Sequence, residues 1–319
     1  MADLLVEIPE NPIPKGTDAG LIETADGCRL RYARVPAPTP SGKGTVVILP
    51  GRNEFIEKYL ETAQDLLRRG YGSAILDWRG QGGSDRLLRD PDRGYIENFS
   101  DYVRDLDAFF QSVVLPDCRG PYYILAHSTG ALIALLATPN LTNRVRRMVL
   151  CAPLLGLYAK PAAARWVERL AGFLYAIGLG KLYMPGRSRR GKTPLFSDAA
   201  LSTDAKRFER NRAVVLQRPD LAINGPTVAW TRAMFKAIET VTAPAFMAEI
   251  HIPTLFLAAG RERVVSTLAI ERYVRRLRSA SLLTIDGGRH ELLQEADFYR
   301  EQVLAAFEAF ADNDGQPWL

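Results

Sequence analysis

Short apolar runs that alternate with helical periodicity are the feature that most limits how this 319-residue chain can fold. Two strands predicted around the turn pair Asp26-Gly27 begin the series. Runs typical of buried strands follow at residues 45–50, 72–77, 122–127, 145–153, 254–260 and 281–287. Segments with apolar residues three or four positions apart follow most of these runs and indicate helices. The alternation predicts an α/β fold with a mostly parallel central sheet and helices on its faces.

The alternation stops once, between residues 156 and 250. Helical pieces lie there at residues 163–178 and 226–241, with no convincing strand, and the pattern of strands and helices resumes after His251-Ile252-Pro253. We therefore expect one catalytic α/β core, residues 1–155 and 251–319, with a helical insertion at 156–250 after the sixth strand.

The insertion is basic, although the whole chain carries a formal charge of only +5. Residues 156–250 hold 15 Lys or Arg and 7 Asp or Glu, whereas the remainder is mildly acidic. Two interpretations stay open: a solvated basic face, or a surface that meets an anionic membrane or a phosphate-bearing substrate. No nucleic-acid partner is expected.

The cysteines and the N-terminus bear on location. Cys28, Cys118 and Cys151 are scattered and odd in number, which favours neither a disulfide framework nor a zinc site. The first residues, MADLLVEIPENP, lack the basic and apolar regions of a signal peptide. No stretch of about 18 residues is apolar and uncharged. We expect a cytoplasmic protein, with any membrane contact peripheral and at the inner face.

The segment Ala126-His-Ser-Thr-Gly130, between a predicted strand and a small-residue helix, has the pattern of a nucleophile elbow. A serine on such a sharp turn exposes its Oγ, and small residues two before and two after it let the turn approach its neighbours. Ala126 stands where glycine is usual. A serine that merely caps a helix is the alternative. The strand and helix around Ser128 favour the nucleophile.

A serine nucleophile needs a base, and the chain has three histidines. His127 is next to Ser128 and cannot easily fold back onto its Oγ. His251 precedes a strand and should lie at the wrong edge of the sheet, since sites form at the carboxyl ends of parallel strands. His290 follows the last strand, at the correct edge, and is the predicted base. A surface or helix-capping histidine is the alternative.

An acid should orient His290 and follow Ser128 in chain order. Glu262 is the only carboxylate in the loop after the strand at 254–260, and we predict this role for it. Asp286, close to His290 in sequence, and Asp77, which precedes Ser128, remain rivals.

Two backbone N–H groups should stabilise the oxyanion. The N–H of Thr129 begins the helix after the elbow, where the helix dipole also favours negative charge. The second donor should come from the loop after the first central strand, where Gly51 permits close approach. We predict that the N–H of Arg52 supplies it.

Two further patterns carry less weight. Gly186-Arg-Ser-Arg-Arg-Gly-Lys-Thr193 fits a P-loop, but no strand precedes it and Pro194 follows, so a basic patch is the preferred interpretation. Trp230, Met234 and Phe235 in the insertion are candidates for an acyl pocket, and residues that pack a helix would look the same.

With these parts in order, residues 18–312 resemble the α/β-hydrolase superfamily, in the branch of monoglyceride lipases and bacterial lysophospholipases. The resemblance lies in LPGRNEFIEKY, LAHSTGA, DGGRHELL and the long stretch from Leu76 to Leu106. It implies a lid formed by the insertion. It also implies a triad of Ser128, His290 and Glu262, with Arg52 and Thr129 as oxyanion donors. Many relatives have Asp at the position of Glu262.

The expected function is a serine carboxylester hydrolase that cleaves single-chain lipids through an acyl-enzyme, in the first place a lysophospholipase. Monoacylglycerol lipase, acyl-thioesterase and lipid transacylase use the same triad and stay open as alternatives. A hydrolase fold that serves only as a binding module is a more remote one. No metal or cofactor is expected.

Overall fold

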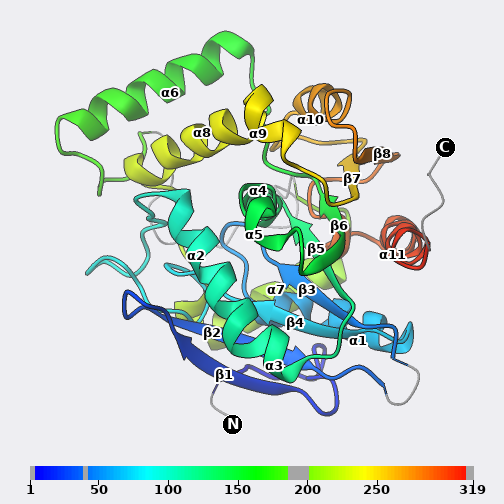
Figure 1. Cartoon of the computed structure of the whole chain (residues 1–319). Coiled ribbons are helices and arrows are strands. Elements are labelled where there is room, and N and C mark those ends of the chain that lie inside the picture. The colour runs from blue at the N-terminus through cyan, green and yellow to red at the C-terminus, as the bar shows by residue number, and fades with distance from the viewer. Residues whose placement is uncertain (1–3, 39–41, 186–200, 314–319) are drawn as a thin grey trace.

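A computed structural model describes residues 4–38, 42–185 and 201–313 (Figure 1). Its centre is an eight-stranded sheet with the strand order β1-β2-β4-β3-β5-β6-β7-β8. β1 and β2 form an antiparallel hairpin, β2 pairs antiparallel with β4, and the strands from β4 to β8 are parallel. The strands are β1 (Asp18–Glu23), β2 (Arg29–Val35), β3 (Thr45–Leu49), β4 (Gly72–Leu76), β5 (Tyr122–His127), β6 (Val145–Cys151), β7 (Thr254–Ala259) and β8 (Ala280–Ile285).

Helices connect the parallel strands and cover both faces of the sheet. The α-helices are α1 (Leu60–Arg68), α2 (Phe99–Phe109), α3 (Leu115–Asp117), α4 (Thr129–Leu136), α5 (Thr138–Leu141), α6 (Pro161–Ala176), α7 (Ala205–Gln217), α8 (Val228–Thr242), α9 (Pro244–Ala248), α10 (Thr267–Val274) and α11 (Asp297–Ala311). A 3₁₀ turn, η1 (Ile56–Tyr59), leads into α1. The mostly parallel α/β fold expected from the sequence is confirmed.

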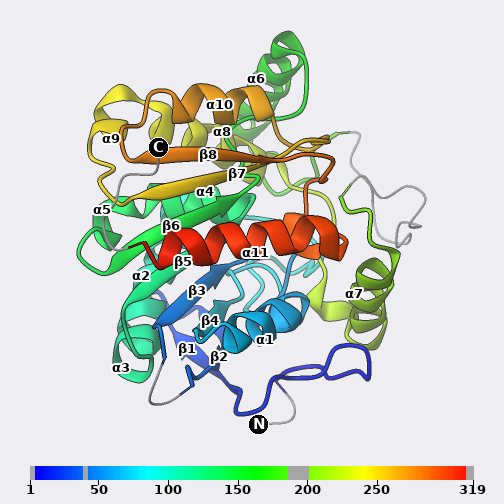
Figure 2. The same cartoon turned by 90° about the vertical axis from the view of Figure 1, so that its right-hand side faces the viewer.

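The two faces of the sheet form two apolar cores. α1 and α11 cover one face and lie in front of the sheet in Figure 2. α2, α4 and α10 cover the other face, together with α8. β3, β4 and β7 are buried along their whole length, which explains why their sequences are continuous apolar runs rather than alternating ones.

Between β6 and β7 the described residues form helices, as the sequence predicts. Local chemistry fixes where these helices begin: Pro161 opens α6, and the side chains of Asp204 and Thr227 cap α7 and α8. α8 packs on α2 and α4 and belongs to the main core, whereas α6 lies outside it and packs on α8 (Figure 1). The division into core and lid stays a prediction. The P-loop-like motif at residues 186–193 lies outside the described residues.

Across the described ranges, no helix combines the length and apolar character that crossing a bilayer requires.

Candidate active site

Ser128 lies on the turn between β5 and α4, with φ of 51° and ψ of −110°. Non-glycine residues rarely adopt a positive φ, so this backbone is strained in the way that an elbow requires. Gly130 explains the small residue after the serine: a Cβ there would lie 2.3 Å from the carbonyl oxygen of Leu49 and 2.5 Å from that of Pro50. Ala126 is buried within β5, and its methyl group fits where glycine is usual.

His290 and Glu262 meet Ser128 at the carboxyl edge of the sheet. Nε2 of His290 is 3.1 Å from Oγ of Ser128, and Nδ1 of His290 is 2.8 Å from Oε2 of Glu262. All three residues are buried. The three side chains predicted from the sequence therefore form one continuous chain of hydrogen bonds.

Glu262 is held in its ionised form. Its Oε1 accepts backbone N–H bonds from Arg263 at 2.9 Å and Val264 at 2.7 Å. Burial raises the pKa of this carboxyl, but the hydrogen bond from His290, the electrostatic interaction with His290 and the backbone N–H groups outweigh it and lower the pKa below the usual range.

The two rival carboxylates lie elsewhere. Asp77 is buried and accepts hydrogen bonds from the Arg31 side chain and from the backbone N–H groups of Ile56 and Gly83. These bonds tie the loop after β4 to β2 and to η1. Asp286 packs beside Gly260, and among the described residues the carboxylate that bonds the His290 ring is Glu262.

The predicted oxyanion loop, residues 50–54, approaches the elbow at Gly130 and is held by two side chains from the loop after β4. The indole of Trp78 donates to the carbonyl of Pro50 at 2.8 Å, and Gln81 donates to the carbonyl of Gly51 at 2.8 Å. Thr129 is the first residue of α4, where backbone N–H groups have no partner within the helix. The guanidinium of Arg52 reaches the insertion, donating to the carbonyl of Asn224 and lying 5.3 Å from the Trp230 ring.

His127 takes part in a buried cluster that the sequence reasoning missed. Its Nδ1 is 3.0 Å from Oε2 of Glu54, and its Nε2 is 3.1 Å from the carbonyl oxygen of His290. Lys58 bonds both Glu54 and Glu291, each at 2.7 Å. The i,i+4 spacing of Glu54 and Lys58 was a signal available in the sequence, but the approach of Glu291 comes only from the fold.

The candidate acyl-pocket residues lie on α8. Trp230 and Met234 are buried in the main core, where the Trp230 ring packs against Phe99 with centroids 5.7 Å apart. Phe235 is partly buried beside them. Their positions fit helix packing, and contact with an acyl chain stays a prediction.

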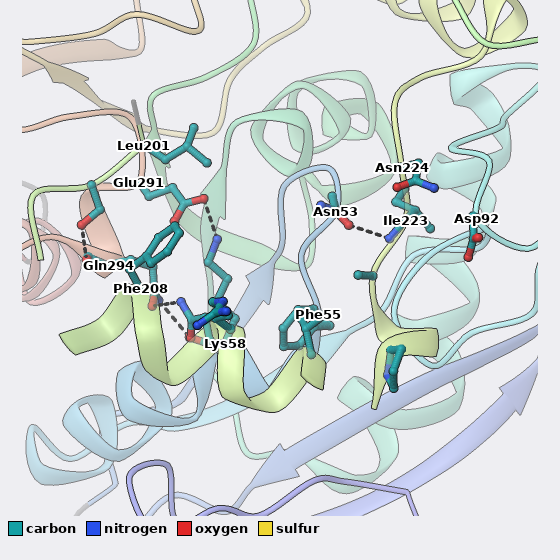
Figure 3. Close-up of a pocket in the computed structure, with 16 residues that line it drawn as sticks. Asn53, Phe55, Lys58, Asp92, Leu201, Phe208, Ile223, Asn224, Glu291 and Gln294 are labelled. Carbon is teal, nitrogen blue, oxygen red and sulfur yellow. Dashed lines mark hydrogen bonds and ion pairs between the residues drawn. The ribbon is translucent and has the colours of Figure 1, made fainter. Parts of the chain in front are cut away.

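A pocket of about 420 Å³ is lined by sequence neighbours of the site residues, and not by Ser128, His290 or Glu262 themselves (Figure 3). Asn53 of the oxyanion loop lines it at one side, and Glu291, which follows His290, lines it at another. Residues of α7, among them Phe208 and Asn211, form part of its wall. The pocket thus lies between the two loops that carry the predicted oxyanion donor and base.

Comparison with known proteins places the chain among hydrolases. Residues 40–297 match the family model Hydrolase_4, described as serine aminopeptidase, S33. The chain is 35% identical to lysophospholipase L2 of Escherichia coli over 85% of its own length and 81% of that protein. It is 28% identical to probable lysophospholipase L2 of Haemophilus influenzae, with 88% of each chain covered.

Solved structures agree in fold. A soluble variant of monoglyceride lipase from Saccharomyces cerevisiae superimposes with a TM-score of 0.73 at 17% identity, covering 94% of this chain and 99% of that one. The family match, the 35% identity over most of the chain and the shared architecture lead to one conclusion. The chain belongs to the Hydrolase_4 (serine aminopeptidase, S33) family of the α/β-hydrolase superfamily.

Proposed function

We propose that this protein is a lysophospholipase in which Ser128 attacks the acyl ester of a single-chain lipid. The observation that carries the proposal is the buried chain of hydrogen bonds from Glu262 through His290 to Ser128. The fold and the relatives named as lysophospholipases and monoglyceride lipases make the chain a carboxylester hydrolase. The particular ester and the roles of single residues belong to the proposal.

The geometry supports the following sequence of steps. Nε2 of His290 takes the Ser128 proton as Oγ attacks the acyl carbonyl, and Glu262 stabilises the imidazolium. The backbone N–H groups of Arg52 and Thr129 stabilise the oxyanion, each contributing about 3–4 kcal/mol to the transition state. His290 then protonates the leaving alcohol, which leaves an acyl group on Ser128. Water activated by His290 hydrolyses this ester and restores the enzyme.

The pocket of Figure 3 fits the polar part of the substrate. The leaving oxygen receives its proton from His290, so the leaving group must lie on the side of that residue. Glu291 borders the pocket there, and Asn53 and Asn211 provide amide groups for hydrogen bonds. We place the polar leaving group of the lipid in this pocket and propose residues 156–250 as the lid that covers it.

Contact with an anionic membrane surface is also part of the proposal, and α6 carries it. Trp166, Phe173 and Ile177 share one face of the helix and are 63%, 62% and 55% exposed. Arg165 and Arg169 are exposed beside them. An apolar strip bordered by cations is typical of helices that lie in the headgroup region of a bilayer.

The test is a hydrolysis panel of lysophospholipid, monoacylglycerol and acyl-thioester, run with the wild-type protein and Ser128→Ala. We expect the highest kcat/KM on lysophospholipid and no hydrolysis by the variant. A preference for monoacylglycerol or thioester would refute lysophospholipid as the substrate but would leave the proposed mechanism intact. Persistent hydrolysis by Ser128→Ala would refute the mechanism.

A further inference from the structure

The buried cluster around His127 takes no part in the proposed catalytic steps. His127 is the last residue of β5 and lies between two loops: residues 50–54, which carry the proposed oxyanion donor, and the loop that carries His290. The rings of His127 and His290 have centroids 4.8 Å apart. His127, Glu54 and Lys58 are almost wholly shielded from solvent.

The surroundings of His127 indicate a charged ring. Each ring nitrogen faces an oxygen, the carboxylate of Glu54 on one side and the carbonyl of His290 on the other. A neutral imidazole has one N–H and satisfies one of these acceptors, whereas an imidazolium donates to both.

The charges of the cluster lead to the same conclusion. Glu54 and Glu291 bring two carboxylates, and Lys58 brings one ammonium group. A charged His127 makes the cluster neutral, and buried charges are stable when they are paired. Burial lowers the pKa of His127, but the charge and hydrogen bond of Glu54 outweigh it and raise the pKa above the usual range.

Glu54 connects this ring to the oxyanion loop. Its Oε2 accepts the backbone N–H of Gly51 and the hydroxyl of Tyr59, the latter at 2.6 Å. A Cβ at position 51 would lie 2.7 Å from Oε2 of Glu54 and 2.9 Å from Nδ1 of His127, so the close approach requires glycine. The residue after Gly51 is Arg52, whose N–H is the proposed oxyanion donor. The His127 ring, next to the elbow in sequence, therefore contacts both Glu54 of the oxyanion loop and the backbone carbonyl of His290.

We propose that His127 is a positively charged positioning residue that holds the His290 loop and the oxyanion loop in register through its two N–H bonds. This inference rests on the proposed function, because its purpose is to keep His290 and the oxyanion donor aligned on Ser128. Misplacement of catalytic groups by about 1 Å costs about a hundredfold in rate.

Two matched substitutions separate the two bonds. The amide of His127→Gln reaches the place of Nε2 and keeps the donor to the His290 carbonyl, whereas that of His127→Asn reaches the place of Nδ1 and keeps the donor to Glu54. Both variants lose the charge. We expect kcat on a soluble short-chain ester to fall about tenfold in His127→Gln and about a hundredfold in His127→Asn, with KM changed less than about threefold. Their Tm values should be alike. Equal kcat values, or losses that follow Tm, would overturn the proposal.

A measurement independent of catalysis tests the charge itself. The chain has three histidines, so ¹⁵N NMR of the imidazoles is simple to assign, with His127→Gln identifying the signals of His127. We expect both nitrogens of His127 to remain protonated at pH 8. A neutral ring there would overturn the proposal even if esters are hydrolysed. If the wild-type protein hydrolyses no ester while His127 is charged, the proposed function fails instead.

Discussion

At the scale of single residues, the identity of the acid is the sharpest question, because three carboxylates were candidates from the sequence. Glu262 bonds the His290 ring, and its second oxygen is held by backbone N–H groups. Glu262→Gln keeps the shape but cannot stabilise the imidazolium. We expect kcat to fall by about 10³–10⁴. Asp286→Asn is the matched control and should stay within about threefold. A silent Glu262→Gln, or a larger loss in Asp286→Asn, would move the acid to Asp286.

Ser128, His290 and Glu262 could be predicted from the sequence because few residues have the chemistry and chain position that a catalytic triad needs. Three histidines and one suitable loop carboxylate left few combinations. The role of His127 could not be predicted in this way, because its bonds to Glu54 and to the His290 carbonyl depend on long-range packing. Neither partner is signalled by the sequence around the elbow.

At the scale of elements, α6 is attached to the rest of the molecule mainly through α8. A small apolar cluster of Ala171, Met184 and Val228 attaches it to α8, apart from the main core. Its strip of Trp166, Phe173 and Ile177 faces outward. The periodicity of residues 163–178 predicted this helix, but which of its faces packs inward became visible only from the position of α8.

The strip predicts a lipid-binding result. Trp166→Ser with Phe173→Ser should weaken binding to vesicles of anionic phosphatidylglycerol at least tenfold, since burial of each large apolar side chain contributes about 1.5–3 kcal/mol. Cosedimentation measures it. Phe298→Ser, which removes a 75% exposed phenylalanine from α11, is the control and should bind like the wild type. Equal binding by all three proteins would rule out α6 as the contact. If the double variant instead loses a dimer that the wild-type protein forms, the strip on α6 binds a second copy of the chain.

α7 is attached to the core through charge. Arg207 donates to Glu61 of α1 at 2.5 and 2.8 Å, and Arg210 bonds the same carboxylate. Burial raises the pKa of Glu61, but these arginines outweigh it and lower the pKa to about 2. The pKa of Glu61 in the folded protein lies below its ordinary value of 4.5. The ionised Glu61 therefore contributes its full stabilisation at pH values above 4.5. It is lost as the pH falls toward 2.

The expected size of this effect is on the order of 2 kcal/mol. Urea denaturation should show Glu61→Gln less stable than the wild type by that amount at pH 7, with a smaller difference at pH 3. Glu301→Gln removes an exposed carboxylate that pairs with Arg69 and should change stability by less than about 1 kcal/mol. A difference that does not depend on pH would show that Glu61 acts through packing alone.

At the scale of the whole molecule, buried ion pairs join the hairpin to the sheet. Arg31 of β2 lies between Asp77 and Glu57, all three buried, with contacts of 2.6 and 2.8 Å. Arg79 joins the buried Asp105 to Asp26, whose side chain is about half exposed. Asp77, Arg79 and Asp105 belong to the long segment from Leu76 to Leu106, so this segment contributes residues to both groups of ion pairs.

Arg31→Ala leaves two buried carboxylates without their cation. We expect a loss of about 3–5 kcal/mol in the free energy of unfolding. Arg29→Ala, two residues away on the same strand, breaks the exposed pair with Asp85 and should leave the stability close to that of the wild type. Thermal and urea denaturation check both variants. Similar losses in the two variants would contradict the role given to burial.

The fold could be predicted from the sequence where local periodicity decides the structure. β3, β4 and β7 are buried along their whole length, and their continuous apolar runs marked them. The place of α8 could not be predicted in this way. Its apolar residues serve the main core as readily as they would line an acyl channel, and only packing against α2 and α4 distinguishes the two uses.

The central claim is that Ser128 is the nucleophile that carries the acyl group. Peptide mapping by mass spectrometry after reaction with a fluorophosphonate tests it most directly, because the reagent bonds covalently to an activated serine. We predict a single adduct on Ser128 that disappears when the protein is denatured before labelling. An adduct on another serine, or none on Ser128 in protein that hydrolyses esters, would contradict the account.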